Sequence, residues 1–203
     1  MCRRAAPLFR RAVSYGNYAG PLRELVHLLK YDQVRPAAPL LGRFLRETMA
    51  KLELPSGILL IPVPLWTGKR RVRGFNQAEE IAKALVGALA SAGAASTSIQ
   101  LDATSLVRQR ETASQTGLTR HQRRANIRGA FTVVRPQAVA GRNILLVDDV
   151  MTTGTTAGEC ARMLLRAGAK QVFVATVARA TKDVQGGRAF AAAAQERGTQ
   201  GHA

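Results

Sequence analysis

The chain has 203 residues, 46% of them hydrophobic, which is enough to fill the core of one domain. Its 30 lysines and arginines outnumber 13 aspartates and glutamates, and the net charge of +17 favours an anionic partner, either a polyphosphorylated small molecule or a nucleic acid. The sequence has no apolar run long enough to span a membrane, no apolar segment of a signal peptide and only two cysteines, so we expect a cytoplasmic protein without a membrane partner or a disulfide framework.

In the first half of the chain, the pattern predicts three helices and one buried strand. Apolar residues recur at helical spacing over residues 21–31 and again over residues 37–51. Residues 58–61 form a short apolar run behind a proline and a glycine, which indicates a buried strand. A further amphipathic helix is expected over residues 76–92.

In the second half, strands and helices continue to alternate. We expect a strand near residues 101–106, a short helix over residues 119–126 and a strand over residues 131–134. A helical stripe runs from Ala157 to Leu165, and residues 172–177 are apolar on both faces, as in a central parallel strand. The alternation predicts an α/β fold with an open, mostly parallel twisted sheet and helices on both faces. Such sheets bind ligands outside the carboxyl ends of their strands.

The segment Ile144-Leu-Leu-Val-Asp-Asp-Val-Met-Thr-Thr-Gly-Thr-Thr156 is the most informative in the chain. Apolar residues lead into Asp148 and Asp149, and a threonine- and glycine-rich turn then opens a helix, so backbone N–H groups and a partial positive charge meet at an anion site. Carboxylates beside that site suit a vicinal diol, and together the two features favour a ribose 5-phosphate. The alternative is a plain helix cap and turn. The segment lacks the Gly-Lys-Ser/Thr of a nucleoside triphosphate loop and the spaced glycines of a dinucleotide fingerprint.

Three segments together resemble the ComF branch of the type I phosphoribosyltransferases. The first is Val147-Asp-Asp-Val-Met-Thr-Thr-Gly-Thr-Thr156, which resembles the phosphoribosyl pyrophosphate signature of the superfamily. The second is Pro62-Val-Pro-Leu65 followed by Arg73-Gly-Phe-Asn-Gln77. The third is Arg108-Gln-Arg-Glu-Thr112 with Gln115, then Arg123-Arg-Ala-Asn126. The resemblance covers most of the chain, about residues 15–179.

The resemblance implies roles for the signature residues. Asp148 and Asp149 would contact the ribose diol as the catalytic carboxylates, and each charge-assisted hydrogen bond would contribute roughly 1.5–3 kcal/mol. We expect Asp149→Asn to weaken phosphoribosyl pyrophosphate binding and to leave thermal stability nearly unchanged. The residues expected to hold the 5-phosphate are Thr152, Thr153, Gly154, Thr155 and Thr156, and Val150 and Met151 are also expected to bind the substrate.

The resemblance also suggests where the diphosphate and a closing loop would lie. Pro64 lies in the segment that matches the pyrophosphate loop, although an ordinary strand end would also explain its prolines. The expected diphosphate contacts are Lys69, Arg70, Arg71 and Arg73. The residues that resemble a mobile loop over the substrate are Arg108, Arg110, Thr112 and Gln115, with a solvated charged loop as the alternative. Diphosphate chemistry implies Mg²⁺, and the sequence has no ligand cluster for a tightly bound transition metal.

One feature departs from the family. Longer ComF members carry an N-terminal zinc module with Cys-x-x-Cys pairs, and here Cys2-Arg-Arg-Ala5 resembles the last pair with its second cysteine replaced. A single thiol cannot hold a structural zinc ion, so either the module is dispensed with or the true start lies upstream. Cys160 is expected to be a small core residue. The expected organisation is an N-terminal helical hood (residues 1–54), a phosphoribosyltransferase-like domain (55–180) and a flexible tail (181–203).

Three functions stay open at this point. The first is a Mg²⁺-dependent phosphoribosyltransferase with an unknown acceptor. The second is a non-catalytic sensor of phosphoribosyl pyrophosphate. The third is a competence-associated factor that works on single-stranded DNA, which the positive charge permits although aromatic residues are few, at 5%. The sequence also leaves open whether the protein forms a homodimer.

Overall fold

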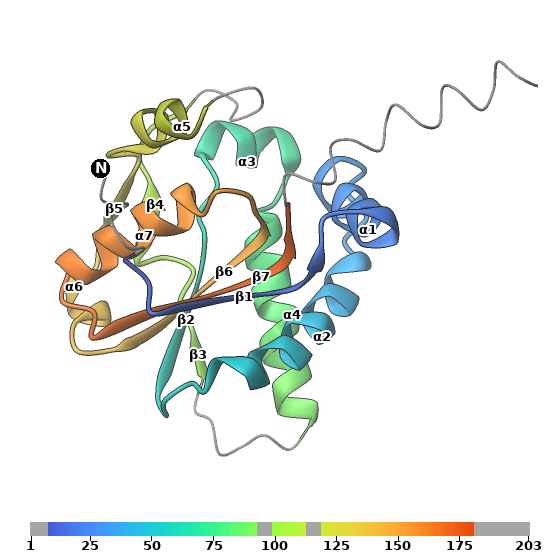
Figure 1. The fold of residues 1–203 in the computed structure, drawn as a ribbon, viewed down its shortest axis with the longest axis horizontal. Coiled ribbons are helices and arrows are strands. Elements are labelled where there is room, and N and C mark those ends of the chain that lie inside the picture. The colour runs from blue at the N-terminus through green and yellow to red at the C-terminus, as the bar shows by residue number, and fades with distance from the viewer. Residues whose placement is uncertain (1–7, 93–98, 113–118, 181–203) are drawn as a thin grey trace, which may run out of the picture.

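The computed structural model describes residues 8–92, 99–112 and 119–180. Its centre is a sheet of five parallel strands in the order β1-β7-β6-β2-β3 (Figure 1). The strands are β1 (Arg11–Asn17), β7 (Gln171–Arg179), β6 (Asn143–Met151), β2 (Ile58–Pro62) and β3 (Ile99–Leu101). Two short strands, β4 (Leu106–Arg108) and β5 (Phe131–Val133), pair antiparallel in a small second sheet. The predicted parallel α/β fold is confirmed.

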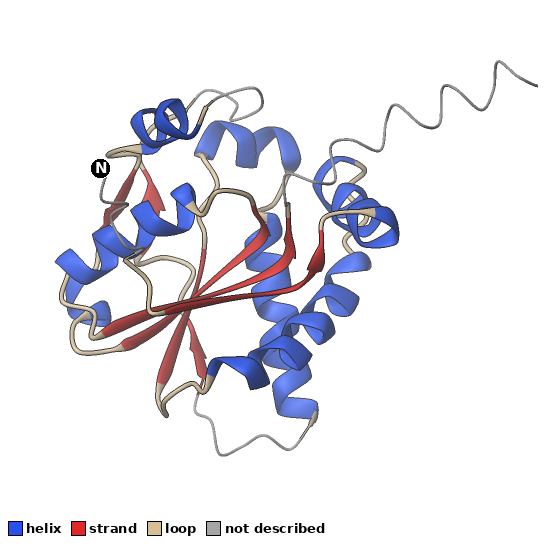
Figure 2. Ribbon diagram, in the orientation of Figure 1, coloured by secondary structure: helices blue, strands red, loops and turns tan. Residues whose placement is uncertain are grey.

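Helices cover both faces of the sheet (Figure 2). Three helices pack on one face, namely α1 (Gly20–Tyr31), α2 (Ala37–Met49) and α4 (Gln77–Ser91). The opposite face carries α7 (Thr155–Arg166) and α5 (Arg120–Ile127). The remaining elements are α3 (Thr67–Arg73), α6 (Pro136–Val139) and a 3₁₀ turn (Ala50–Leu52).

The apolar run of β6 divides its side chains between two cores. Leu145 and Val147 pack with the helices α2 and α4, whereas Ile144 and Leu146 pack with α7. This alternation follows from the two-residue period of a strand, and all four side chains are fully buried. Burying each one contributes about 1.5–3 kcal/mol. The strand that ends in the two aspartates is therefore fixed from both sides.

The chain reverses its direction of travel across the sheet between β6 and β2. From β6 the chain passes through α7 to β7 on one side, and from β2 it passes through α4 to β3 on the other side. In open α/β sheets the carboxyl ends of strands at such a point bound a crevice that binds ligands. The backbone N–H of Val63 donates to the Val147 carbonyl at 2.9 Å, which joins the two strand ends.

The structure differs from the sequence prediction in several elements. The strand expected near residues 101–106 is wrong: β3 ends at Leu101, and Asp102 accepts hydrogen bonds from the backbone of Thr104 and Ser105, so the chain turns before β4 begins. The sequence pattern does not predict the strand β1, the helix α3, the four-residue helix α6 or the 3₁₀ turn. β1 has a mixed polar pattern at the sheet edge, and α3 buries none of its seven residues, so neither carries the usual hydrophobic signal.

The N-terminal segment takes part in the central sheet and in the core. β1 pairs in parallel with β7, and α2 packs so closely on α4 that a Cβ atom at Gly42 would lie 2.7 Å from the Ala84 backbone. The expected cysteine motif at residues 2–5, Gln115 and the expected tail at 181–203 lie outside the described residues. Within the described ranges, no helix is long and apolar enough to cross a membrane.

Candidate functional site

The loop after β6 opens onto the N-terminus of α7. Asp148 still lies in the β6–β7 ladder, opposite Thr176, and the loop begins after Met151. Gly154 is the N-cap of α7 and adopts a left-handed conformation with φ of 71°, which glycine adopts without strain. No side chain caps the helix. The N-terminus of a helix carries a partial positive charge and N–H groups that have no acceptor within the helix, which makes it suited to an anion.

A hollow of about 440 Å³ lies beside this loop. We call it the ribose pocket, after the ribose 5-phosphate that the sequence predicts as its ligand. Predicted residues of the signature line it together with side chains from β7, α1 and α5. Thr153 faces another hollow on the other side of the loop, and its hydroxyl lies 2.7 Å from that of Thr155. The lining residues are Tyr18, Lys30, Arg123, Asp148, Val150, Met151, Thr152, Gly154, Thr155, Thr156, Ala157, Thr176 and Ala180.

Asp149 lies behind the pocket and is paired with Lys30 of α1. The Lys30 ammonium lies 2.7 Å from Asp149 Oδ2, and the side chains are 17% and 5% exposed. Asp149 Oδ1 accepts the Val150 N–H at 2.6 Å, so each carboxylate oxygen faces a donor or a cation. Burial disfavours the charged lysine, but the Asp149 carboxylate outweighs it and raises the pKa of Lys30. This ion pair ties α1 to the end of β6.

Asp148 is the carboxylate that lines the pocket. One of its oxygens accepts the Asp149 N–H at 2.9 Å. Burial, and after it the negative charge of Asp149, raises the pKa of Asp148 above that of an ordinary carboxyl group, while Lys30 opposes the shift. A ligand that brings a cation or hydroxyl donors to Asp148 would relieve this unfavourable charge.

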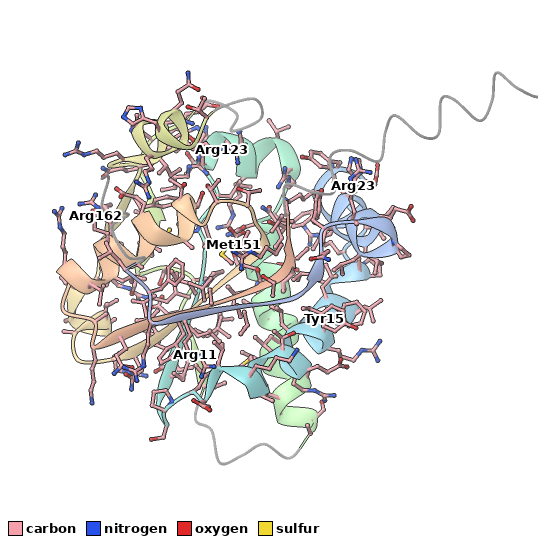
Figure 3. All side chains as sticks on the ribbon, viewed as in Figure 1. Arg11, Tyr15, Arg23, Arg123, Met151 and Arg162 are labelled. Atoms are coloured by element: carbon pink, nitrogen blue, oxygen red, sulfur yellow. The ribbon has the colours of Figure 1, made fainter. Side chains whose placement is uncertain are left out.

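The structure brings to the pocket residues that sequence reasoning missed. Arg123 of α5 donates to the Thr152 hydroxyl at 3.2 Å, and both side chains line the pocket. Arg123 and Met151 are labelled in Figure 3 on α5 and at the end of β6. Lys30 is separated from Asp149 by more than a hundred residues. No local sequence pattern around Lys30 indicates that it pairs with Asp149. Arg123 lies in one of the segments that resemble the ComF branch, but the resemblance alone implies no role for it.

The Arg-Gly-Phe-Asn-Gln segment forms the corner between α3 and α4. Gly74 ends α3 with φ of 80°, and Phe75 is buried beneath the Arg35 guanidinium, 4.9 Å from the ring centroid. Asn76 caps α4 by accepting the Ala78 N–H at 3.2 Å and donates to the Val63 carbonyl at 3.0 Å. The segment therefore fixes the chain that follows β2.

The residues expected to contact the diphosphate do not line the ribose pocket. Pro64 is half-buried in the loop after β2. Arg70 forms an ion pair with Glu79 at 3.2 Å, and Arg73 donates to Gln77 at 2.5 Å and lies over the Tyr31 ring. The exposed members of the set on α3 are Lys69, Arg70 and Arg71. Their contact with a diphosphate stays a prediction.

The segment that resembles a mobile loop begins at the end of β4. Arg108 is half-buried, donates to the Thr112 hydroxyl and lies over the Phe131 ring, 5.6 Å from its centroid. Burial lowers the pKa of Arg108, and the charge of Asp148 is among those that oppose this shift. Arg110 is exposed and donates to two backbone carbonyls at the end of α5, at 2.7 and 2.9 Å. Arg110 thus holds α5, whereas Arg108 lies within electrostatic reach of the pocket.

The carboxylates fit a weakly held Mg²⁺ ion better than a protein-bound metal centre. Across the described ranges, no group of three or more histidine, cysteine or acidic side chains could hold a metal ion. Mg²⁺ is commonly held by one or two carboxylates together with substrate phosphates, and Asp148 offers one such oxygen donor. Cys160 is buried in α7 as a free thiol, which confirms its predicted place in the core.

Comparisons with known proteins agree with this arrangement. Residues 72–188 match the family model described as "Phosphoribosyl transferase domain". The chain is 38% identical over 180 residues to DNA utilization protein YhgH of Escherichia coli O157:H7, in an alignment covering 85% of this chain and 74% of that protein. It is 32% identical over 190 residues to Competence protein F of Haemophilus influenzae, covering 88% of this chain and 77% of that protein.

Proposed function

The chain belongs to the phosphoribosyltransferase family and is related to Competence protein F, and on this premise we propose that it binds phosphoribosyl pyrophosphate and transfers its phosphoribosyl group. The observation that carries the proposal is the ribose pocket, where Asp148 and the uncapped N-terminus of α7 line the same hollow. A ligand with a vicinal diol and a phosphate suits both features, because the diol can donate to Asp148 and the phosphate can accept from the helix N-terminus.

Different residues of the pocket contact different parts of the ligand. The 5-phosphate accepts from the backbone N–H groups at the start of α7 and from hydroxyls of the Thr152–Thr156 loop. The ribose hydroxyls donate to Asp148. Arg123 reaches the loop from α5 and adds a positive charge beside the phosphate. Holding the sugar in this way fixes its anomeric carbon as the pyrophosphate leaves.

A Mg²⁺ ion would accompany the diphosphate, neutralising part of its charge and stabilising the leaving group. Asp148 is the side chain placed to hold the ion together with ligand oxygens. The pyrophosphate end of the ligand would extend toward the end of β2, where Val63 and Val147 join the two strands. There the basic residues of α3 and Arg108 supply the remaining positive charge.

Isothermal titration calorimetry with phosphoribosyl pyrophosphate and Mg²⁺ tests the binding step. We expect binding by the unchanged protein, and binding at least tenfold weaker for ribose 5-phosphate, which lacks the diphosphate. The absence of any heat with phosphoribosyl pyrophosphate, at concentrations where the protein is folded, would overturn the proposal.

Catalysis needs its own measurement, because a sensor would bind the same ligand without turnover. We expect pyrophosphate release when an acceptor from a panel of bases and amines is supplied with phosphoribosyl pyrophosphate. Binding without release across the whole panel would favour the sensor.

Work on DNA is the second candidate function. Two relatives are named for DNA utilization and for competence, and the net charge of +17 favours a polyanionic partner. A DNA role is compatible with phosphoribosyl pyrophosphate binding if the two ligands use different surfaces.

A further inference from the structure

A second hollow, of about 820 Å³, lies on the other side of the loop that follows β6. It is bounded by α5, α7, the end of β7 and the segment before β1. Figure 3 labels Arg162 on α7, which is one of its walls. We call this hollow the arginine groove, after the residues Arg124, Arg128, Arg162, Arg166 and Arg179 that line it.

Most of this positive charge is not neutralised. Arg124, Arg128, Arg166 and Arg179 are exposed, and none of them forms an ion pair with another described residue. Glu159 is the acidic side chain among the described residues that line the groove.

Glu159 is already engaged by neighbouring groups. Its carboxylate accepts from the Arg162 guanidinium at 2.5 and 2.8 Å and from the Gly129 N–H at 2.7 Å. These contacts fix Arg162 on α7 and tie the end of α5 to it. The Arg162 hydrogen bond outweighs burial and lowers the pKa of Glu159, so the carboxylate stays charged and paired. The groove therefore presents a net positive surface to a ligand.

The arginines are spaced for a repeating anion. Arg124 and Arg128 lie four residues apart at the end of α5, and Arg162 and Arg166 lie four residues apart on α7. Side chains at this spacing are neighbours on a helix surface, with their Cβ atoms about 5–6 Å apart. Two such pairs border one groove. A single small anion would use part of this array, whereas a chain of phosphates would meet it at successive positions.

The groove also has an apolar side. Leu8 is 48% exposed, and Phe9 is half-buried with a ring atom 3.8 Å from the Cβ position at Gly154. Aromatic and apolar surfaces beside cations are typical of single-strand binding, since unpaired bases can stack there while their phosphates meet the arginines. The bases of a duplex face each other and would leave Leu8 and Phe9 without a partner.

We propose that the arginine groove binds single-stranded DNA, with phosphates along the arginines of α5 and α7 and bases against Leu8 and Phe9. The proposal rests on the second candidate function and assigns DNA contact to a surface distinct from the ribose pocket. The two hollows share Met151, Thr152, Gly154 and Thr155, but the groove arginines line the groove alone.

Fluorescence anisotropy with a labelled oligothymidylate of about 15 nucleotides tests the groove in the full chain. We expect the double variant Arg124→Gln/Arg128→Gln to weaken binding by at least tenfold and to reduce the slope of log K against log salt by about 1.4, because two phosphate contacts with a single strand are lost. The matched control is Arg23→Gln/Arg43→Gln, which removes the same charge from exposed positions on α1 and α2. The control should change the affinity less than twofold.

Further outcomes separate the parts of the proposal. Equal losses of affinity in both double variants would mean that binding depends on the overall charge of the protein, and this result would overturn the assignment of DNA binding to the groove. A wild-type protein that does not bind the strand would overturn the DNA function itself. Competition by a duplex or by polyglutamate as strong as by the single strand would overturn the proposed ligand class. We expect calorimetry with phosphoribosyl pyrophosphate to give the same affinity for the groove variant and the unchanged protein; loss of that affinity would overturn the separation of the two sites.

Discussion

Asp148 and Asp149 are neighbours in the chain, yet their surroundings give them different tasks. Asp149 is buried, accepts the Val150 N–H and pairs with Lys30. Asp148 lines the ribose pocket, and burial next to a second carboxylate raises its pKa. We therefore expect Asp148 to contact the ribose diol, whereas Asp149 holds the Val150 N–H and Lys30.

Replacing Asp148 should damage ligand binding without damaging the fold. We expect Asp148→Asn to weaken phosphoribosyl pyrophosphate binding by about tenfold to a hundredfold, the worth of one charge-assisted hydrogen bond. Its free energy of unfolding at pH 7 should not fall, because the substitution removes an ionisable group whose charged form is disfavoured by burial and by Asp149. Calorimetry and urea unfolding measure the two quantities. A large loss of stability would show that Asp148 is structural.

The raised pKa of Asp148 also gives a pH dependence with a definite sign. Above the ordinary carboxyl pKa of about 4 and below the raised folded value, the folded state holds a proton that the unfolded state has released. This group's contribution to stability therefore falls as pH rises through that window. The advantage of Asp148→Asn over the unchanged protein in urea unfolding should grow with pH across it. An advantage that shrinks with rising pH would contradict the assignment.

The Lys30–Asp149 pair changes what we expect of Asp149 from sequence alone. Lys30→Met leaves a buried carboxylate without its cation, and Asp149→Asn leaves a mostly buried ammonium without its anion. Each variant should lower the free energy of unfolding at pH 7 by about 1–3 kcal/mol. The double variant should lose less than the sum, with a coupling of about 1 kcal/mol or more in urea unfolding. Additive losses would mean that the pair contributes nothing as a unit.

At the scale of elements, the corner between α3 and α4 depends on Asn76. We expect Asn76→Ala to lower the free energy of unfolding by about 2–4 kcal/mol, because the α4 cap is lost and the buried Val63 carbonyl loses its donor. Asn76→Asp keeps the capping oxygen and removes the donor, so its loss should be smaller. Urea unfolding of both variants checks the order. If Asn76→Asp lowers the free energy of unfolding as much as Asn76→Ala does, the cap of α4 contributes nothing to stability.

The turn at Asp102 joins the central sheet to the second sheet and depends on pH. Burial opposes the charged form, but hydrogen bonds from Ser105 and Thr104 outweigh it and lower the pKa of Asp102 to about 2. The folded value is depressed, so this stability is present above pH 4 and is lost as pH falls from about 4 toward 2.

We expect Asp102→Asn to cost about 1–2 kcal/mol at pH 7 and progressively less at lower pH. Urea unfolding between pH 7 and pH 3 follows the difference, with Glu24→Gln as the control at an exposed carboxylate. A difference that does not shrink on acidification would contradict the assignment.

The elements that sequence reasoning found are those with a one-sided or fully apolar pattern. The strands of the core and the helices α2, α4 and α7 each bury a regular apolar set, which periodicity detects. β1 is held in the sheet by pairing with β7, which lies more than 150 residues away in the chain. A local sequence pattern does not indicate such a distant partner. α3 carries four basic residues, and its sequence lacks an apolar stripe.

The candidate site divides in the same way. The signature loop is continuous in sequence, so its pattern predicts a site, and most of its members line one pocket. Lys30 and Tyr18 reach that pocket from the first helix and the segment before it, through packing that depends on the whole fold. The difference between Asp148 and Asp149 arises from which side of β6 each one faces, and adjacent identical residues cannot reveal it.

At the scale of the whole molecule, the ribose pocket lies where separate parts of the chain meet. Lys30 belongs to α1, Arg123 to α5, and Asp148 with Thr155 to the β6–α7 junction. These elements pack on opposite faces of the sheet, since α1 belongs to one core and α5 and α7 to the other. A ligand in the pocket would bridge both cores, so binding should stabilise the fold as a unit.

This coupling predicts the effect of the proposed ligand on unfolding. At a hundred times its dissociation constant, phosphoribosyl pyrophosphate with Mg²⁺ should add about 2.7 kcal/mol to the free energy of unfolding. For a chain of this length, that corresponds to a rise in Tm of roughly 5–10 °C. Thermal unfolding followed by circular dichroism measures the shift. Asp148→Asn at the same ligand concentration should gain only about 0.4–1.4 kcal/mol, because tenfold to hundredfold weaker binding leaves the ligand at about one to ten times the dissociation constant of the variant. An equal shift with inorganic pyrophosphate and Mg²⁺ alone would mean that the ribose and its 5-phosphate contribute nothing, and the pocket would then not be the site that binds the sugar.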